Sequence, residues 1–136
     1  AESKRITVRL GTLDDALIVG DAVRIRQLLL NLIDNAIKYT PENGNVEVSL
    51  LREQRFAKIR IKDSGVGIHA EDISKIFDRF YRVDKARSRE LGGSGLGLSI
   101  SKWIADIHGG TISVESEVNK GSLFSVMLPL KPQSPL

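Results

Sequence analysis

The residues best suited to chemistry lie on one predicted helix, Asp21 to Thr40. At about 100° per residue, Asn31, Asn35 and Lys38 share one face, and apolar residues occupy the opposite sector. Asparagine is a mediocre helix former, so a face selected for stability alone would carry Glu and Lys. Two amides and an ammonium instead offer carbonyl oxygens to a hard cation and positive charge to its anion. The competing interpretation is an ordinary solvated helix face, which would be favoured for an isolated helix.

Asp63 is the second feature with candidate chemistry, after the polar face of the helix. Two alternating runs, 46–50 and 57–61, predict a hairpin, and the phase of the second run places Asp63 on its buried side. A buried carboxylate is costly unless it is hydrogen-bonded or paired. Asp63 therefore either caps the turn that follows or accepts a hydrogen bond from an amino group of a ligand at the mouth of a pocket. Gly65 and Gly67 would let the backbone approach such a ligand closely.

A glycine-rich segment, Gly92 to Gly97, follows the charged, aperiodic stretch 82–90 and precedes a predicted helix, Leu96 to His108. A loop of this length is usually functional or disordered. Four glycines before a helix suit a hinged flap whose backbone amides and helix N-terminus hold phosphate. Two other glycine signatures do not fit. A P-loop requires lysine where Leu98 stands, and a dinucleotide fingerprint requires G-x-G-x-x-G directly after a strand.

The remaining elements must position these residues. Alternation from Ile6 to Leu10 predicts a strand with one dry face, and hydrophobic periodicity gives the helix at 96–108 an apolar set that includes Trp103 and Ile107. The other expected elements are a short strand at 16–19, a short helix at 70–76, an aromatic cluster of Phe77, Phe80 and Tyr81, and strands at 111–116 and 122–130.

Composition limits the classes of protein. The chain has 136 residues, of which 41% are apolar, which suits a single domain with one core. It has no cysteine, so thiolate metal sites and disulfides are excluded. Because no apolar run is long enough to span a membrane, we expect a soluble, cytoplasmic domain. The net charge of +3 is too mild to favour a nucleic-acid partner.

Four segments together resemble a known family. They are NLIDNAIKYT (31–40), DSGVGI (63–68), FDRFYRVD (77–84) and GGSGLGLSI (92–100). In order and spacing they resemble the four boxes of the ATP-binding catalytic domain of bacterial sensor histidine kinases, in the superfamily shared with gyrase, Hsp90 and MutL. The resemblance covers about Gly20 to Leu130. It implies an α+β fold: a two-layer sandwich of a mixed, mostly antiparallel sheet with three main helices on one face and a flexible ATP lid.

The resemblance also implies ATP and Mg²⁺ as cofactors and assigns roles to residues. Asn35 would be the Mg²⁺ ligand and Asn31 would border the same site. Lys38 and Arg82 would approach the phosphates, completing the catalytic set. Asp63 would accept from the adenine amino group, so ATP should be favoured over GTP. The other implied ATP contacts are Tyr39, Gly65, Gly67, Ile68, Phe80, Gly93, Ser94, Gly95, Leu96, Gly97, Leu98 and Ser122. Phe77 and Phe80 would anchor the flap on the core.

Asn31 bears on the reaction. Hydrolysing members of the superfamily carry a Glu at this position as general base, and an amide cannot take a proton at neutral pH. The γ-phosphoryl group would therefore pass to a nucleophile from outside, which the resemblance implies is a histidine on a separate dimerisation domain. His69 and His108 lack the flanking residues of a phosphoacceptor box, so we interpret both as structural or exposed. Two alternatives share the fold: a nucleotide-binding pseudo-kinase and an anti-sigma-type serine kinase.

The resemblance further implies the context of the domain. Residues 1–130 would form the catalytic domain and 131–136 a loose tail, with the dimerisation domain absent from this chain. The full-length protein would be a homodimer in the bacterial inner membrane that acts on a response regulator. The piece considered alone would be monomeric.

Overall fold

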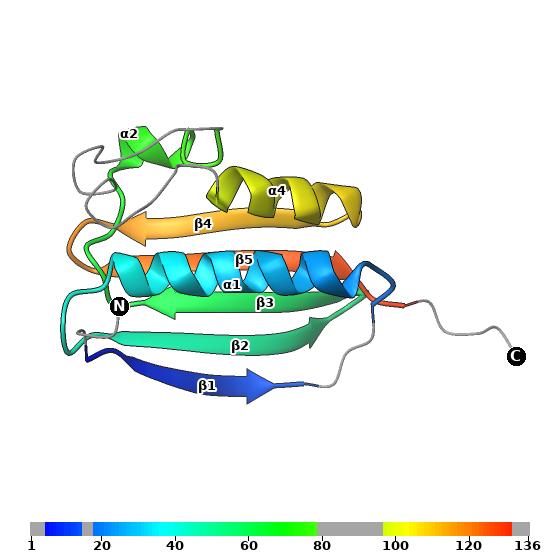
Figure 1. Ribbon diagram of the computed structural model, residues 1–136, viewed down its shortest axis with the longest axis horizontal. Helices are drawn as coiled ribbons and strands as arrows, with labels where there is room; N and C mark the ends of the chain where they lie inside the picture. The colour runs from blue at the N-terminus through cyan, green and yellow to red at the C-terminus, as the bar shows by residue number, and fades with distance from the viewer. Residues whose placement is uncertain (1–4, 15–17, 79–96, 132–136) are drawn as a thin grey trace, which may run out of the picture.

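The computed structural model describes residues 5–14, 18–78 and 97–131. In chain order, their elements (Figure 1) are β1 (Thr7–Leu13), α1 (Ala22–Lys38), β2 (Asn45–Glu53), β3 (Phe56–Asp63), α2 (Ala70–Ile73), α4 (Gly97–Ile107), β4 (Thr111–Glu117) and β5 (Gly121–Pro129).

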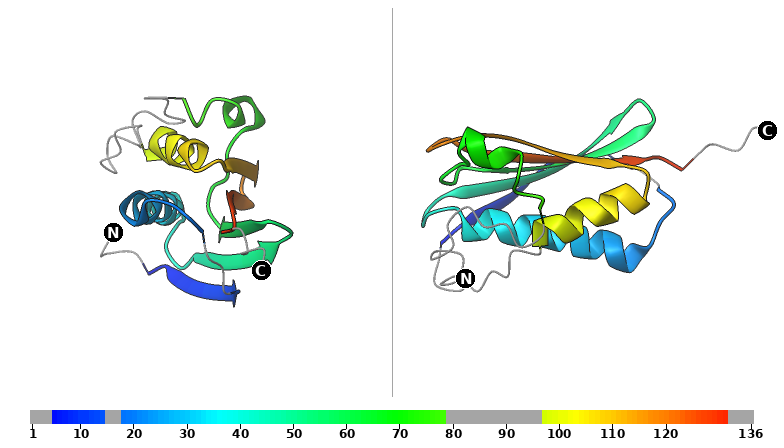
Figure 2. Two further views of the ribbon diagram at one scale, coloured as in Figure 1. Left: turned by 90° about the vertical axis from the view of Figure 1, so that its right-hand side faces the viewer. Right: turned by 90° about the horizontal axis from the view of Figure 1, so that it is seen from above.

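The five strands form one sheet in the order β1-β2-β3-β5-β4. β1 pairs with β2 in parallel, and the other three pairs are antiparallel. Seen from the end and from above, α1 and α4 cover one face of this sheet (Figure 2), while the four-residue α2 packs beside β4. The expected α+β sandwich with a mixed, mostly antiparallel sheet is therefore confirmed.

The helix α1 begins where the sequence predicts. The side chain of Asp21 accepts hydrogen bonds from the backbone N–H groups of Val23 (3.0 Å) and Arg24 (3.2 Å), which would otherwise be unpaired. Lys38 lies in the last turn, where its charge complements the helix dipole. Tyr39 forms the C-cap, so the polar stripe predicted from the sequence lies on a well-bounded helix.

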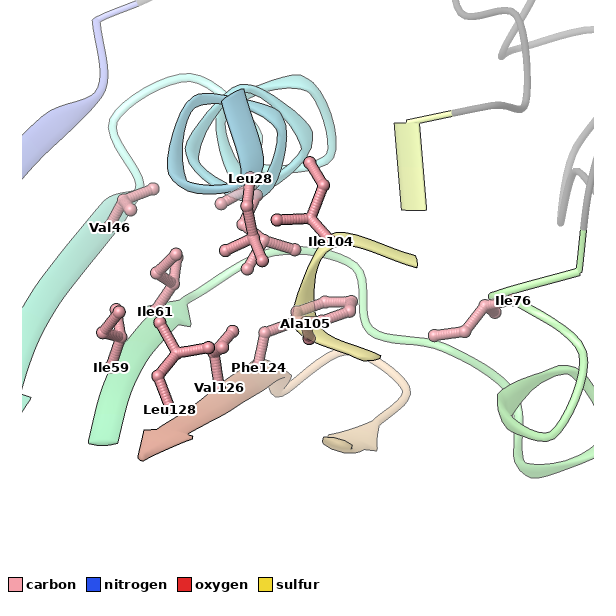
Figure 3. Packing of buried hydrophobic residues seen from close by; sticks show 12 residues of the cluster. Leu28, Val46, Ile59, Ile61, Ile76, Ile104, Ala105, Phe124, Val126 and Leu128 are labelled. Atoms are coloured by element: carbon pink, nitrogen blue, oxygen red, sulfur yellow. The ribbon is translucent and has the colours of Figure 1, made fainter. Parts of the chain in front are cut away.

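The core lies between the two long helices and the inward rows of the sheet (Figure 3). α1 contributes Leu28, Leu32 and Ala36, all buried, and α4 contributes Ile104 and Ala105. The sheet contributes alternate residues of its strands, as a period of two requires: Val46, Ile59, Ile61, Phe124, Val126 and Leu128.

One aromatic contact joins the segment after α2 to the core. The rings of Phe77 and Phe124 lie 6.2 Å apart between centroids and meet edge to face at 88°. The predicted anchoring role of Phe77 is consistent with this contact. Phe80 and Tyr81, the other members of the expected aromatic cluster, lie outside the described residues.

Several expectations about the elements were wrong in part. The face of β1 expected to be dry is not, because this strand lies at the edge of the sheet, to the side of α1: Val8 is 49% exposed and Leu10 69%. Trp103, predicted to be in the core, is 48% exposed and lies under the guanidinium of Arg24, 4.7 Å from the ring centroid.

Two short elements also differ from expectation. The helix expected at 70–76 ends at Ile73, and turns continue to Phe77. Of the strand expected at 16–19, Ile18 and Val19 are not in a strand, and 15–17 lie outside the described residues. Across the part of the chain that the structure describes, we find no helix long and apolar enough to cross a bilayer.

Leu28→Ala should destabilise the domain by about 2–5 kcal/mol, because it removes a fully buried side chain and leaves a cavity. Leu30→Ala is the matched control. It lies two residues along the same helix but is 57% exposed, so its effect should stay within about 0.5 kcal/mol. Urea unfolding of both variants measures the difference. Equal losses would contradict the assigned face of α1.

Candidate functional site

A polar row closes the helix-covered core at one end of the sheet. In register across three strands it runs Ser116, Ser122 and Asp63, and the buried, apolar Val46 follows on β2. On the same face, the next row toward the middle of the sheet is apolar throughout: Val114, Phe124, Ile61 and Val48. β3 ends and β5 begins at the polar row. The C-terminal end of α1 lies at the same end of the sheet (Figure 1).

Asp63 is 6% exposed, as the strand phase predicts. Its Oδ1 atom accepts hydrogen bonds from the backbone N–H groups of Gly65 (2.9 Å) and Ser122 (3.2 Å). Asp63 therefore does cap the following turn. Among the described residues no donor reaches its Oδ2 atom, so the capping role leaves that oxygen available to accept. Burial raises the pKa of the Asp63 carboxyl, and the two N–H donors oppose that rise.

The loop after Asp63 is fixed to the two elements beside it. The N–H of Val66 donates to the carbonyl of Tyr39 (3.1 Å), the C-cap of α1, and the carbonyl of Val66 accepts from Asn119 N–H (2.8 Å) in the β4–β5 turn. A Cβ at Gly65 would strike the Tyr39 carbonyl, and one at Gly67, where φ is +75°, would strike the Glu117 carbonyl. The fold therefore requires glycine at both positions, in addition to the predicted close approach of a ligand.

The polar stripe of α1 meets the start of α4. Nδ2 of Asn31 donates to the carbonyl of Gly97 at 3.4 Å, and the Ser101 hydroxyl donates to the same carbonyl at 2.8 Å. Gly97 is the last glycine of the glycine-rich segment and the first residue of α4. Asn31 therefore lies beside the end of the glycine-rich segment, as the sequence predicts.

Asn35 and Lys38 lie further along the same face, and both are partly buried. Lys38 Nζ pairs with Asp34 Oδ2 at 3.2 Å. Because Asp34 is largely exposed, this pair contributes little stability, and an incoming anion can compete for the ammonium. The described residues hold no cluster of three His, Cys, Asp or Glu side chains that would suit a metal held by protein alone. An amide such as that of Asn35 suits Mg²⁺, which usually keeps waters and substrate phosphates as its other ligands.

A second group of contacts between α1 and α4 lies near the start of α1, far from the polar row. His108 Nε2 accepts from the backbone N–H of Asp21 (3.0 Å), and Nδ1 donates to the carbonyl of Ile104 (2.7 Å). The contact with Asp21 and the stacking of Arg24 on Trp103 hold α4 against the start of α1, while the contact with Ile104 orients the His108 ring. The structural interpretation of His108 is confirmed, and His69 is exposed, as predicted.

Sequence reasoning missed the roles of Thr40, which is buried, and Ser116, which is partly buried. The hydroxyl of Thr40 donates to the carbonyl of Ala36 (2.7 Å) just beyond the end of α1. Ser116 Oγ accepts from Ile68 N–H (2.8 Å) and contacts the carbonyl of Gly121 (3.0 Å) and the Ser122 hydroxyl (2.7 Å). Ser116 continues the inward phase of Ile112 and Val114, and that signal was available in the sequence.

Other predicted contacts divide into two groups. Tyr39, Ile68 and Leu98 are partly buried, and Ser122 is buried in the polar row. The remaining predicted contacts lie outside the described residues: Phe80, Arg82, Gly93, Ser94, Gly95 and Leu96.

Residues 20–132 match the family described as histidine kinase-, DNA gyrase B-, and HSP90-like ATPase. The chain belongs to this ATPase family. The match includes every element of the site: the stripe of α1, the polar row and the start of α4.

Relatives in the ATPase family include sensor kinases. The chain is 46% identical over 121 residues to the sensor histidine kinase WalK of Bacillus subtilis, covering 88% of this chain but 20% of that protein. Among solved structures, the mycobacterial sensor histidine kinase MprB superposes with a TM-score of 0.81 at 31% identity, covering 94% of this chain and 84% of that one. Full-length ShkA in complex with AMPPNP gives a TM-score of 0.77 at 28% identity, covering 99% of this chain and 27% of that one.

Asp63→Asn should stabilise the domain at neutral pH. Because burial raises the carboxyl pKa, the folded state binds more protons than the unfolded state just above pH 3.8, and stability falls as pH rises through the folded-state pKa. Asparagine does not ionise, and it keeps an oxygen for the two backbone donors. The melting temperature of the variant should exceed that of the wild type at pH 7, and the gap should narrow toward pH 4.5.

The control for this variant is Asp78→Asn, which alters an exposed carboxylate. Its melting temperature should follow that of the wild type at both pH values. A gap at Asp63 that does not change with pH would contradict the desolvation of its carboxylate.

Proposed function

We propose that this chain is the ATP-binding catalytic domain of a sensor histidine kinase, which binds Mg-ATP and passes the γ-phosphoryl group to a histidine on another domain. One observation carries the proposal: the two halves of the site are joined by a direct contact. The carbonyl of Tyr39, one residue beyond Lys38, accepts from the N–H of Val66, three residues after Asp63. The amide stripe of α1 and the buried carboxylate therefore border the same end of the sheet.

The half of the site that contains the Asp63 carboxylate is suited to adenine. Asp63 is held by two backbone donors on Oδ1, so the position of its other oxygen is fixed before any ligand arrives. A carboxylate accepts hydrogen bonds and does not donate them, so it favours the amino group of adenine and repels the carbonyl of guanine. We infer that the domain prefers ATP to GTP. The neighbouring Tyr39 and Ile68 would lie against the base.

The half of the site that contains the Asn31 and Asn35 amides is suited to the phosphates. Asn35 would hold Mg²⁺ through its amide oxygen, and the bound ion would supply positive charge to the phosphate oxygens. Lys38 would exchange its partner Asp34 for a phosphate, which costs little because an ion pair with a largely exposed carboxylate is weak. Arg82 and the glycines from 93 to 97 would add donors from the segment before α4. Asn31 would keep its contact with Gly97 and so locate that segment beside the phosphates.

The site favours phosphoryl transfer over hydrolysis. Asn31 stands where a general base would activate water, and its amide cannot accept a proton at neutral pH. The chemistry left to these residues is to position the triphosphate and neutralise its charge while an external nucleophile attacks in line. His108 is committed to structural hydrogen bonds, so it does not supply that nucleophile.

The nucleophile and the partners belong to the rest of the protein. The chain spans about a fifth of the length of WalK, a sensor histidine kinase. We propose that residues 1–130 act with a dimerisation domain that carries the phosphoacceptor histidine, in a membrane-associated homodimer whose catalytic domains face the cytoplasm. A response regulator would receive the phosphoryl group. The ShkA complex with AMPPNP supports a nucleotide site in this fold.

Asn35→Ala should lower phosphorylation of the acceptor histidine by about 100-fold or more, because it removes the amide that holds the charge-neutralising ion. The assay follows labelled phosphate from ATP to the histidine in the full-length kinase. Asn45→Ala, which changes an exposed asparagine on β2, should leave transfer unchanged. Unchanged transfer by Asn35→Ala would contradict the metal role.

The chemistry of the product distinguishes the alternatives. Phosphohistidine is acid-labile and stable to alkali, so an acid-stable product would indicate a serine kinase of the same fold. A full-length protein that binds ATP and never labels itself would indicate a pseudo-kinase.

A further inference from the structure

Ser116 is at the centre of a hydrogen-bond network that the proposed function does not use. It lies on β4, partly buried, at the end of the polar row that contains Ser122 and Asp63. Its hydroxyl oxygen has three polar neighbours: the N–H of Ile68 at 2.8 Å, the carbonyl of Gly121 at 3.0 Å and the hydroxyl of Ser122 at 2.7 Å.

Counting protons sets the direction of these bonds. The N–H of Ile68 brings its own proton, so Ser116 accepts there. The carbonyl of Gly121 can only accept, so Ser116 must donate its single proton to it. The bond to Ser122 then forms only if Ser122 donates. The reverse direction would leave the Gly121 carbonyl without the Ser116 proton, so one of the three bonds would be lost.

This direction determines what Ser122 can offer a ligand. Its proton is used on Ser116 and its backbone N–H on Oδ1 of Asp63. The Ser122 hydroxyl therefore has only lone pairs left. Asp63, its partner in register on β3, is a carboxylate and also has only lone pairs. Two neighbouring side chains on the helix-covered face thus present acceptors and no donor.

We propose that Ser116 is a specificity-determining positioning residue, which holds the Ser122 proton away from the ligand and so keeps the base end of the site free of donors. Such an end accepts an amino group on the six-position of a purine and rejects a carbonyl there. This inference rests on the proposed nucleotide function and names what sets its base preference. Ser116 itself acts through Ser122 and Asp63.

Ser116→Ala tests the inference. Without its partner, the Ser122 hydroxyl can turn its proton toward a carbonyl. The probes are Mg-ATP and Mg-ITP. ITP has a carbonyl in place of the six-amino group and a proton on N1, and the N1 difference is the same for every variant compared. Equilibrium titration gives the two dissociation constants. The ratio of the ITP constant to the ATP constant should fall about tenfold, as expected for one hydrogen bond to a neutral group. The loss of the Ile68 contact should weaken both nucleotides alike and cancel in the ratio.

Two further variants separate specificity from structure. Ser116→Ala combined with Ser122→Ala removes the released donor, so the ratio should return toward the wild-type value although more hydrogen bonds are lost. Ser113→Ala, on the same strand with an exposed side chain, should leave the ratio unchanged. If Ser116→Ala does not fold, Ser116→Thr and Ser116→Val replace it. These two are similar in shape and suited to a strand, and only threonine keeps the hydroxyl.

The outcomes are distinct. An unchanged ratio in Ser116→Ala, or equal ratios in the threonine and valine variants, would overturn the role of Ser116 and leave the proposed function standing. A double variant whose ratio stays low would also overturn it, because the donor on Ser122 would not be the cause. A wild-type domain that binds neither nucleotide would overturn the proposed function and this inference together.

Discussion

The burial of one carboxylate is the constraint on which the site depends. Asp63 lies in the inward row of the central strand, where an unpartnered charge would be costly. The fold supplies two backbone donors to a single oxygen, one from the turn after β3 and one from β5. Both N–H groups reach Asp63 because the backbone passes close to it at Gly65 and Gly121. A side chain at Gly65 would strike the Tyr39 carbonyl, and one at Gly121 would strike the Asp63 carbonyl. The carboxylate, the turn and the end of α1 therefore form one unit.

The other half of the site is held by a different means. α4 meets α1 through Asn31 and Gly97 at one point, and through His108, Arg24 and Trp103 toward the start of α1. The 3.4 Å contact at Asn31 is long, whereas the contact between Asp21 N–H and His108 Nε2 is 3.0 Å. The contact of His108 with Asp21 therefore holds α4 beside the start of α1 more closely than the contact of Asn31 with Gly97 does further along.

Much of this arrangement could be predicted from the sequence because it depends on local period. The phase of β3 placed Asp63 inside, and the cap at Asp21 and the stripe of α1 follow from spacing along one helix. Other features depend on which elements become neighbours. The exposure of Val8 follows from the edge position of β1, and the Ser116 network follows from the register of β4 with β5. Lys38 pairs with Asp34, a contact that local spacing permits but does not require.

The central claim is that the α1 amides and the Asp63 carboxylate bind two ends of one Mg-ATP molecule. A nuclear magnetic resonance titration tests it directly. The side-chain amide signals of Asn31 and Asn35, and the backbone signals of Gly65 and Ser122, should all shift with a single dissociation constant for Mg-ATP. Adenosine alone should move the signals of Gly65 and Ser122 and leave the Asn35 amide in place. If the two groups titrate with different constants, or if the Asn35 amide never moves, the two ends do not share a ligand and the account is contradicted.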